Sequence, residues 1–249
     1  MSALILALVA GAVVGLALGG LGGGGSVLAV PALIYLLGFI PAEATTASLV
    51  IVTVTSLTAL YAHARAGNVR WKAGAAFAAA GILPAALAGA AAARLPQAVL
   101  TLAFAAVAAV AAFKMLRPSA PTGTGSGAVR PARAAGAGAG LGALTGLLGV
   151  GGGFLAVPAL VTVLSFEMQA AVGTSLLVIT ANSLASLATR SGAAVSLDWA
   201  VIGPFIATAV LGAWDGKRLA AKVSGPRLQR VFAMVLLAVA AFMLVDAVV

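Results

Sequence analysis

The chain has 249 residues, of which 63% are hydrophobic and only 8% are charged. Soluble domains carry about 25% charged residues, so this composition excludes an ordinary soluble protein and indicates that most of the chain lies in lipid. The net charge of +9 comes from basic residues in short runs between apolar stretches, without a basic stripe interleaved with aromatic residues, so we expect no nucleic-acid partner.

Ten apolar stretches follow one another along the chain, five in each half. They lie at 3–21, 26–39, 44–62, 73–93 and 97–116, and then at 134–149, 153–166, 169–189, 199–214 and 228–248. The longer ones suit a bilayer core that needs ~20 helical residues, whereas the second and seventh, with 14 residues each, reach only about 21 Å. We therefore predict an all-α, polytopic membrane protein in which these two short helices are broken or re-entrant.

The two halves are related in sequence. Residues 15–39 match residues 142–166 at 14 of 25 positions without a gap. Such a repeat is typical of a transporter built from two related halves, with its site where they meet. A Pro/Gly/Ser-rich segment, 117–133, is predicted to be a cytoplasmic linker between a first transmembrane repeat, 1–116, and a second, 134–249.

Five crossings per half would insert the second half upside down, and the distribution of charge fits this topology. Twelve of the 14 basic residues lie within or directly beside the segments that follow the third, fifth and ninth stretches, and only Arg94 and Arg190 lie elsewhere. By the positive-inside rule these three segments are cytoplasmic, so both termini are predicted to be extracytoplasmic. The first stretch has no basic segment before it and is predicted to belong to the fold rather than to a cleaved signal peptide.

The glycine run Gly22 to Gly25, echoed around Gly151 to Gly153, is the strongest candidate for a site. Consecutive glycines end a helix and leave backbone amides unpaired, which lipid does not tolerate unless the amides face protein, water or a ligand. A helix that restarts after the run would direct free N–H groups and the positive end of its dipole into that gap. Two such N-termini near mid-depth would bind an anion without any charged side chain.

The first short helix could restart at Ser26 or at Pro31, because proline suits a first helical turn and Pro158 occupies the equivalent place in the second half. Glycines that only turn a tight hairpin are the alternative. The residues that we assign to the substrate site from this motif are Gly24, Gly25, Ser26, Pro31, Gly151, Gly152, Gly153 and Pro158.

The third span of each half supplies a second candidate surface. Ser48 and Thr55 in the first half correspond to Ser175 and Asn182 in the second, and positions spaced by seven fall on one helical face. Their hydroxyls and amide could donate hydrogen bonds to the oxygens of an anion, and Asn182 is the strongest donor among them. The alternative is that serine and threonine bond their own helix and hold membrane helices together.

Titratable groups offer little chemistry. The acidic residues lie in turns or at span ends, where we interpret them as solvated or capping groups rather than proton relays. They are Glu43, Glu167, Asp198, Asp215 and Asp246. His63, the single histidine, lies beside a basic loop. The absence of cysteine excludes disulfide bonds and thiolate metal sites. No grouping of histidine, acid and nucleophile supports hydrolysis, so we expect no enzyme, no catalytic or metal site and no cofactor.

The glycine motifs resemble those of the TauE/SafE family of sulfite and organosulfonate exporters. The match rests on GLGGGGSVLAVPAL at 21–34, GVGGGFLAVPAL at 149–160, and AVGTSLLVIT at 171–180 with a weaker echo at 45–53. The resemblance implies a polytopic protein of the bacterial inner membrane that moves small sulfur-containing anions. The GTSL element is intact only in the second half, which directs the site assignment toward Gly173, Thr174 and Ser175.

We therefore expect a secondary membrane transporter that exports a small anion such as sulfite or a sulfonate by alternating access. No Walker motif is present, so coupling would come from an ion gradient or from the gradient of the substrate itself. An anion channel and a non-transporting membrane scaffold remain the alternatives. The expected partners are the anionic solute and the lipid bilayer, and a homo-oligomer stays open.

Overall fold

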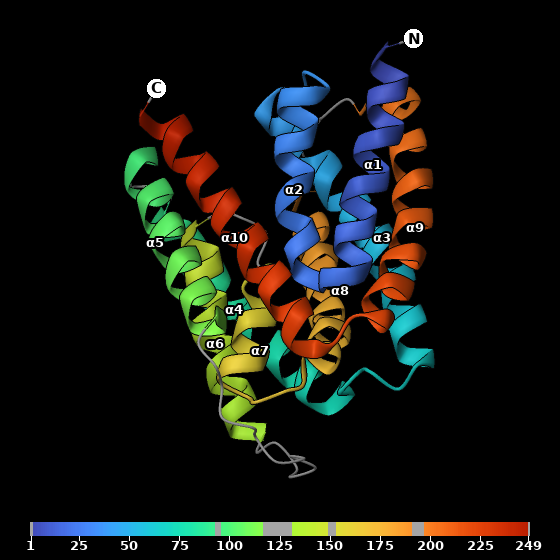
Figure 1. Cartoon of the computed structure of the whole chain (residues 1–249). Helices are drawn as coiled ribbons and strands as arrows, with labels where there is room; N and C mark the ends of the chain where they lie inside the picture. Colours follow the sequence, from blue (N-terminus) through green and yellow to red (C-terminus); the bar gives the residue numbers. More distant parts are fainter. Residues whose placement is uncertain (1, 93–95, 117–130, 149–152, 191–196, 249) are drawn as a thin grey trace.

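The computed structural model describes residues 2–92, 96–116, 131–148, 153–190 and 197–248, and Figure 1 shows their arrangement. Within these ranges every regular element is a helix, so the prediction of an all-α protein is confirmed. The first half contains α1 (Ser2–Leu21), α2 (Ser26–Pro31), α3 (Pro41–Arg65), α4 (Trp71–Ala92) and α5 (Gln97–Leu116). The second contains α6 (Pro131–Leu148), α7 (Ala156–Thr162), α8 (Met168–Arg190), α9 (Trp199–Lys222) and α10 (Gly225–Val248).

Six helices in the described ranges are long and apolar enough to cross a membrane, namely α1, α3, α4, α8, α9 and α10. Large apolar side chains also cover the outside of the molecule, for example Leu83, Leu87 and Leu211, each about two-thirds exposed. In water such a surface would aggregate, whereas in a bilayer it faces acyl chains. The prediction of a polytopic membrane protein is therefore confirmed.

The first short stretch forms one arm of a helical hairpin. After α1 the glycines Gly22–Gly25 form a turn of 3-10 helix, and α2 then runs back beside α1 (Figure 1). The chain continues from α2 into a π-helical turn, Ala32–Leu36. Proline lacks an N–H group, so Pro31 interrupts the regular i to i−4 bonds at the point where the wider turn begins. The arm is too short to cross the membrane by itself.

Helices of one half pack against helices of the other half, so the two halves do not form separate units. α1 packs along α9, and α4 packs along α6, with the two helices of each pair running in the same direction. Glycine allows the backbones to approach closely in both pairs, because a Cβ at Gly15 would overlap the carbonyl group of Ala209 and a Cβ at Gly142 would overlap that of Gly81. Gly15 and Gly142 are equivalent residues of the sequence repeat, so the two interfaces are built alike.

Helices α3 and α8 pack against each other, and α5 pairs with α10 at one side (Figure 1). A buried hydrogen bond joins α3 to α8, with Ser56 Oγ 2.9 Å from Thr180 Oγ1. Gln229 Nε2 on α10 donates to the carbonyl oxygen of Met115 on α5 at 2.6 Å. Both hydrophobic clusters of the core take residues from both halves.

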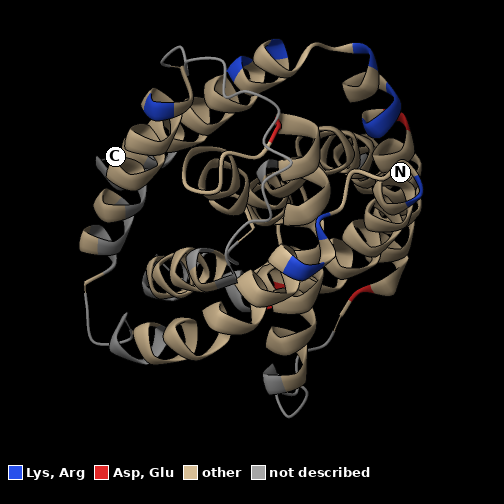
Figure 2. Cartoon of the chain, turned by 90° about the horizontal axis from the view of Figure 1, so that it is seen from below, with Lys and Arg blue, Asp and Glu red and all other residues tan. Residues whose placement is uncertain are grey.

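The two ends of the bundle differ in charge. The start of α1 and the end of α10 lie at the same end, shown at the top of Figure 1. The opposite end carries the loop between α3 and α4 and the turn between α9 and α10, and Figure 2 shows Lys and Arg at helix ends in the view from there.

The helix α6 begins at Pro131, three residues before the predicted start of the second repeat, and 117–130 of the predicted linker lie outside the described residues.

Candidate functional site

The glycine run of the first half is a closed turn. Gly22 has a φ of +65°, a left-handed conformation that suits glycine, and it turns the chain out of α1. The N–H group of Gly23 donates to Ser175 Oγ at 3.3 Å, and that hydroxyl donates in turn to the carbonyl oxygen of Val172 at 2.8 Å. The expected open gap with unpaired amides is therefore absent from Gly22–Gly25, because the 3-10 turn and Ser175 supply partners.

Of the two possible starts for the first short helix, the structure selects Ser26. Its N–H group and its hydroxyl both donate to the carbonyl oxygen of Gly23, the hydroxyl at 2.7 Å. Pro31 is the last residue of α2, so the prediction that it might lie in the first turn is wrong: the 3-10 turn leads straight into the helix and leaves no gap before Pro31. Pro158 is the third residue of α7 and does lie in a first turn.

The two glycine motifs touch each other. A Cβ on Gly23 would overlap the carbonyl group of Gly153, and a Cβ on Gly153 would lie 2.9 Å from Ser26 Oγ. Gly25 packs against Leu18 of α1 in the same tip. Gly24 belongs to the 3-10 turn, whereas Gly151 and Gly152 lie outside the described residues. The structure thus brings Ser26, Gly153 and Ser175 together around one point of the backbone.

The start of α8 joins this tip to the basic end of the molecule. Thr174 Oγ1 accepts a hydrogen bond from the backbone N–H of Arg70 at 3.1 Å. A Cβ on Gly173 would lie 2.5 Å from the carbonyl oxygen of Asn68, so the loop between α3 and α4 rests directly on α8. Gly173 and Thr174 therefore hold this loop, while the next residue, Ser175, holds the glycine tip.

The polar face of the third spans is only partly available to a ligand. Ser48 Oγ donates to the carbonyl oxygen of Thr45 at 2.8 Å, and Thr55 Oγ1 donates to that of Ile51 at 2.7 Å, so both hydroxyls bond their own helix as the alternative interpretation held. Asn182 is half-buried, and its side chain has no hydrogen-bond partner within the described ranges. It is the side-chain donor of this face that stays available.

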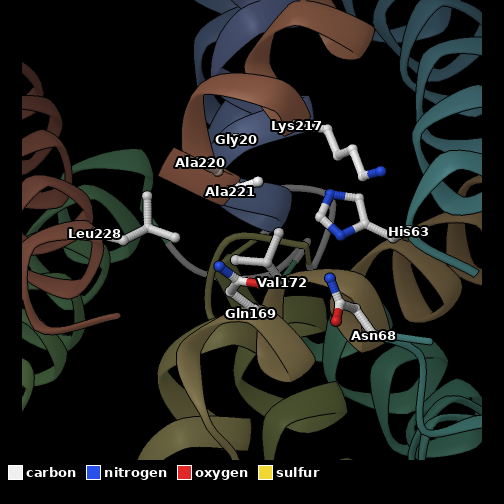
Figure 3. Close-up of a pocket in the computed structure, with 9 residues that line it drawn as sticks. All are labelled: Gly20, His63, Asn68, Gln169, Val172, Lys217, Ala220, Ala221 and Leu228. Atoms are coloured by element: carbon white, nitrogen blue, oxygen red, sulfur yellow. The ribbon is translucent and has the colours of Figure 1, made fainter. Parts of the chain in front are cut away.

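A small cavity lies beside the glycine tip (Figure 3). Gly20 and Val172 line it on the side of the tip, and the polar side chains around it belong to His63, Asn68, Gln169 and Lys217. Its volume is about 10 Å³, which is the room that one water molecule needs. The sequence did not single out Asn68, Gln169 or Lys217, because they come from a loop and two helices far apart in the chain and share no motif.

His63 contributes an unused polar atom to this region. Its Nε2 lies 3.0 Å from the carbonyl oxygen of Gly19, and since a carbonyl only accepts, Nε2 carries the hydrogen of this bond. Nδ1 is buried and has no partner among the described residues. With the hydrogen on Nε2, the neutral imidazole can still accept a hydrogen bond from water or from a solute at Nδ1. The sequence drew attention to His63 only as the single histidine.

The acidic groups behave as solvated or capping groups at two of the predicted positions. Asp198 precedes α9 and accepts a hydrogen bond from the N–H of Ala200 at 3.0 Å, which is the geometry of a helix cap. Asp215 lies 3.4 Å from Arg218, and both side chains are largely exposed. The side chains of Asn68, Gln169 and Lys217 around the cavity carry N–H groups, which can donate hydrogen bonds to an anion.

The chain is similar to a known protein family and to two relatives over nearly its whole length. The model of the family described as sulfite exporter TauE/SafE matches residues 7–243. A protein of Xylella fastidiosa (strain Temecula1 / ATCC 700964), described as "Probable membrane transporter protein", is 35% identical over 249 residues, covering 97% of this chain and 95% of the relative. A protein of the same description from strain 9a5c is 36% identical with the same coverage. No solved structure matches.

Proposed function

This chain belongs to the sulfite exporter TauE/SafE family, and on that basis we propose that it is a secondary transporter that exports a small anion, such as sulfite or an organosulfonate, by alternating access. The family, the description of its relatives and the six apolar helices indicate a multi-pass membrane transporter. The proposed alternating access depends on how the two halves meet.

The contact between the two copies of the glycine motif is the observation that carries this proposal. Gly23 of the first half contacts Gly153 of the second half, and helices of the two halves pack together around this contact. In carriers built from repeats, the substrate site lies at the interface between the repeats, close to the ends of broken helices. A contact between two equivalent broken segments is therefore the place where a change in the angle between the halves would open or close a path.

We infer that the halves are inverted repeats. If the second half had the same orientation as the first, its fourth helix, α9, would run antiparallel to α1. The two helices instead run parallel, since Gly11, Gly15 and Gly19 of α1 meet successively later residues of α9. The pair α4 and α6 also runs parallel, as inversion requires. This arrangement supports alternating access by rocking one half against the other.

The proposed substrate site comprises the two glycine tips and the face of α8 that carries Ser175 and Asn182. In the described state Gly23 N–H and Ser175 Oγ bond each other, so an anion would compete for a donor and a hydroxyl that are already paired. The cavity beside the tip has room for about one water molecule, less than an oxyanion needs. We therefore interpret this state as closed, with passage requiring the tips to separate.

We further propose that the protein lies in the bacterial inner membrane with both termini extracytoplasmic. The chain has no cysteine, so single cysteines introduced at exposed residues report their side without background. An Ala66→Cys protein should react with an impermeant maleimide only after the cells are opened, and an Ala3→Cys protein should react in intact cells. Labelling of both from the outside would exclude this orientation.

Counterflow in proteoliposomes is the direct test of the proposed function. Proteoliposomes that contain the purified protein and are loaded with sulfite should take up labelled sulfite in exchange, in a saturable manner. Resolvable unitary currents in a planar bilayer would instead indicate a channel. Thermal unfolding in the presence of sulfite, sulfate, thiosulfate, sulfoacetate or taurine identifies the ligand class. A ligand at 100 times its dissociation constant raises the free energy of unfolding by about 2.7 kcal/mol. Absence of stabilisation by all of these solutes would favour the scaffold alternative.

A further inference from the structure

A second cleft opens between the last turns of α3 and α9, and the transport proposal makes no use of it. Its volume is about 150 Å³. The residues that line it are Ala62 and Arg65 from α3, and Trp214, Lys217 and Arg218 from α9. Lys217 also borders the small cavity beside the glycine tip, but the other four residues belong to this cleft alone.

The cleft carries an excess of positive charge. Three of its five lining residues are basic, and the neighbouring Asp215 neutralises little of this charge, since its contact with Arg218 at 3.4 Å joins two side chains that are 63% and 71% exposed. Arg65 is held in place by Tyr61: its guanidinium carbon lies 5.8 Å from the ring centroid and Nη1 donates to the phenol oxygen at 3.4 Å. Guanidinium groups match the geometry of phosphate oxygens, which makes a phosphate the best-fitting ligand.

Exposed apolar side chains form a stripe along each of the two helices, and both stripes lead toward this cleft. On α3, the exposed Val54, Leu57 and Tyr61 precede Arg65 at spacings of three and four, so all lie on one face of the helix. On α9, which runs in the same direction beside it, the exposed Leu211 and Trp214 precede Arg218 with the same spacing. Trp and Tyr at the transition from apolar to basic residues are typical of the membrane interface.

We propose that this cleft binds the phosphate headgroup of an anionic phospholipid, whose acyl chains lie along the apolar stripes of α3 and α9. A free phosphate would use the basic residues but would leave the stripes without a function, whereas a lipid uses both at once. Basic pockets between transmembrane helices on the cytoplasmic side are suited to anionic headgroups in this way. Lipid binding at this cleft does not depend on which solute is transported.

Native mass spectrometry of the full chain in neutral detergent tests this proposal. The probes are dioctanoyl-phosphatidylglycerol, dioctanoyl-phosphatidylcholine and inorganic phosphate, titrated separately. We expect one molecule of phosphatidylglycerol to bind more tightly than phosphatidylcholine. The Arg65→Gln/Arg218→Gln protein should bind phosphatidylglycerol roughly 30-fold more weakly, that is by about 2 kcal/mol at about 1 kcal/mol for each basic residue removed.

The matched control is Arg227→Gln/Arg230→Gln, which removes the same charge from exposed positions at the start of α10 that do not line the cleft. It should retain the affinity for phosphatidylglycerol, and unchanged thermal unfolding without lipid would show that both double variants fold. An equal loss in the control would reduce the effect to general charge and overturn the site. Equal binding of phosphatidylcholine would also overturn it, and inorganic phosphate binding as tightly as the lipid would replace the lipid by a free anion.

Discussion

The sequence AVPAL occurs at equivalent places in the repeat, at 29–33 and 156–160. The helix α2 begins before it at Ser26 and ends within it at Pro31, whereas α7 begins only at Ala156, which corresponds to residue 29. Pro31 consequently ends its helix, whereas Pro158 lies in the first turn of the other. Burial differs as well: four of the seven residues of α7 are buried but only two of the six residues of α2. One arm is held in the core, and the other lies nearer to lipid.

This difference between equivalent segments shows that the motif determines where the chain turns but that the surrounding helices determine the conformation. A carrier built from two inverted repeats must be able to hold its halves in different conformations, since two identical halves would open both sides together or neither. The unequal arms α2 and α7 are compatible with the proposed alternating access. The following substitutions compare matched positions around these arms, beginning with the largest expected effect.

The largest effect is expected from a negative charge at the tip of the first arm. Ser26→Asp would place a carboxylate beside Gly153, where repulsion of an anion at about 4 Å costs about 4 kcal/mol at an effective dielectric constant near 20. The dissociation constant for substrate should rise about 1000-fold and counterflow should stop. Ser26→Asn has nearly the same shape without the charge and should keep measurable counterflow. Equal transport by both variants would remove the tip from the site.

Asn182 and its repeat equivalent Thr55 provide the next comparison. Asn182→Ala should weaken substrate binding by roughly 1.5 to 3 kcal/mol, the range for hydrogen bonds to charged groups, because its amide has no partner within the described ranges. Its melting temperature should hardly change. Thr55→Val removes a hydroxyl that bonds Ile51 in its own helix and should leave the affinity as it was. Reduced stability of Asn182→Ala with normal affinity would identify the amide as a helix contact instead.

Ser175 and Ser48 are also equivalent, and they separate a bond between halves from a bond within one helix. Ser175→Ala leaves the buried N–H of Gly23 without its acceptor, which should lower the free energy of unfolding by about 1 to 3 kcal/mol. Ser48→Ala removes only a bond to Thr45 in the same helix and should change stability by less than about 0.5 kcal/mol. Denaturant unfolding in detergent measures both. Similar values for the two would mean that the bond between the first glycine tip and α8 contributes nothing to stability.

The smallest effect is expected where the two arms end alike. Gly38 and Ser165 occupy equivalent positions with φ values of +70° and +54°, and the following residues repeat the same backbone bond, Phe39 to Leu33 and Phe166 to Leu160. Ser165→Gly should relieve left-handed strain and stabilise the protein by about 1 kcal/mol, and Gly38→Ser should cost about the same. Thermal unfolding checks both signs. Stabilisation by Gly38→Ser would contradict the shared conformation.

Helix positions were predictable from the sequence because hydrophobicity is a local property. The stretch predicted at 97–116 coincides with Gln97–Leu116, whereas the ninth was predicted to end at 214 and continues as a helix to Lys222. The reason is that Lys217, Arg218 and Lys222 were interpreted as a loop, although a helix that leaves the membrane can carry charged residues into water.

The site was predictable only in part. The glycine motif and Ser175 were identified from the repeat, and the structure brings them into contact. The 3-10 turn at Gly22–Gly25 was not predicted, because the fate of its amides depends on a hydroxyl more than 150 residues away. Asn68 and Gln169 likewise acquire a role only through packing, since the loop between α3 and α4 rests on α8 for reasons that no local pattern records.

The parallel pairing of α1 with α9 has a consequence for biosynthesis. The glycine face of α1 is complementary to a helix that the ribosome completes about 200 residues later, which at about 5 to 20 residues per second means a delay of roughly 10 to 40 s. During that interval α1 already occupies the membrane with lipid or the insertion machinery against its glycines. The first half therefore cannot complete its packing until the second half is synthesised. A nascent chain that stalls before Trp199 would have all helices of the first half but would lack α9, the helix that packs along α1.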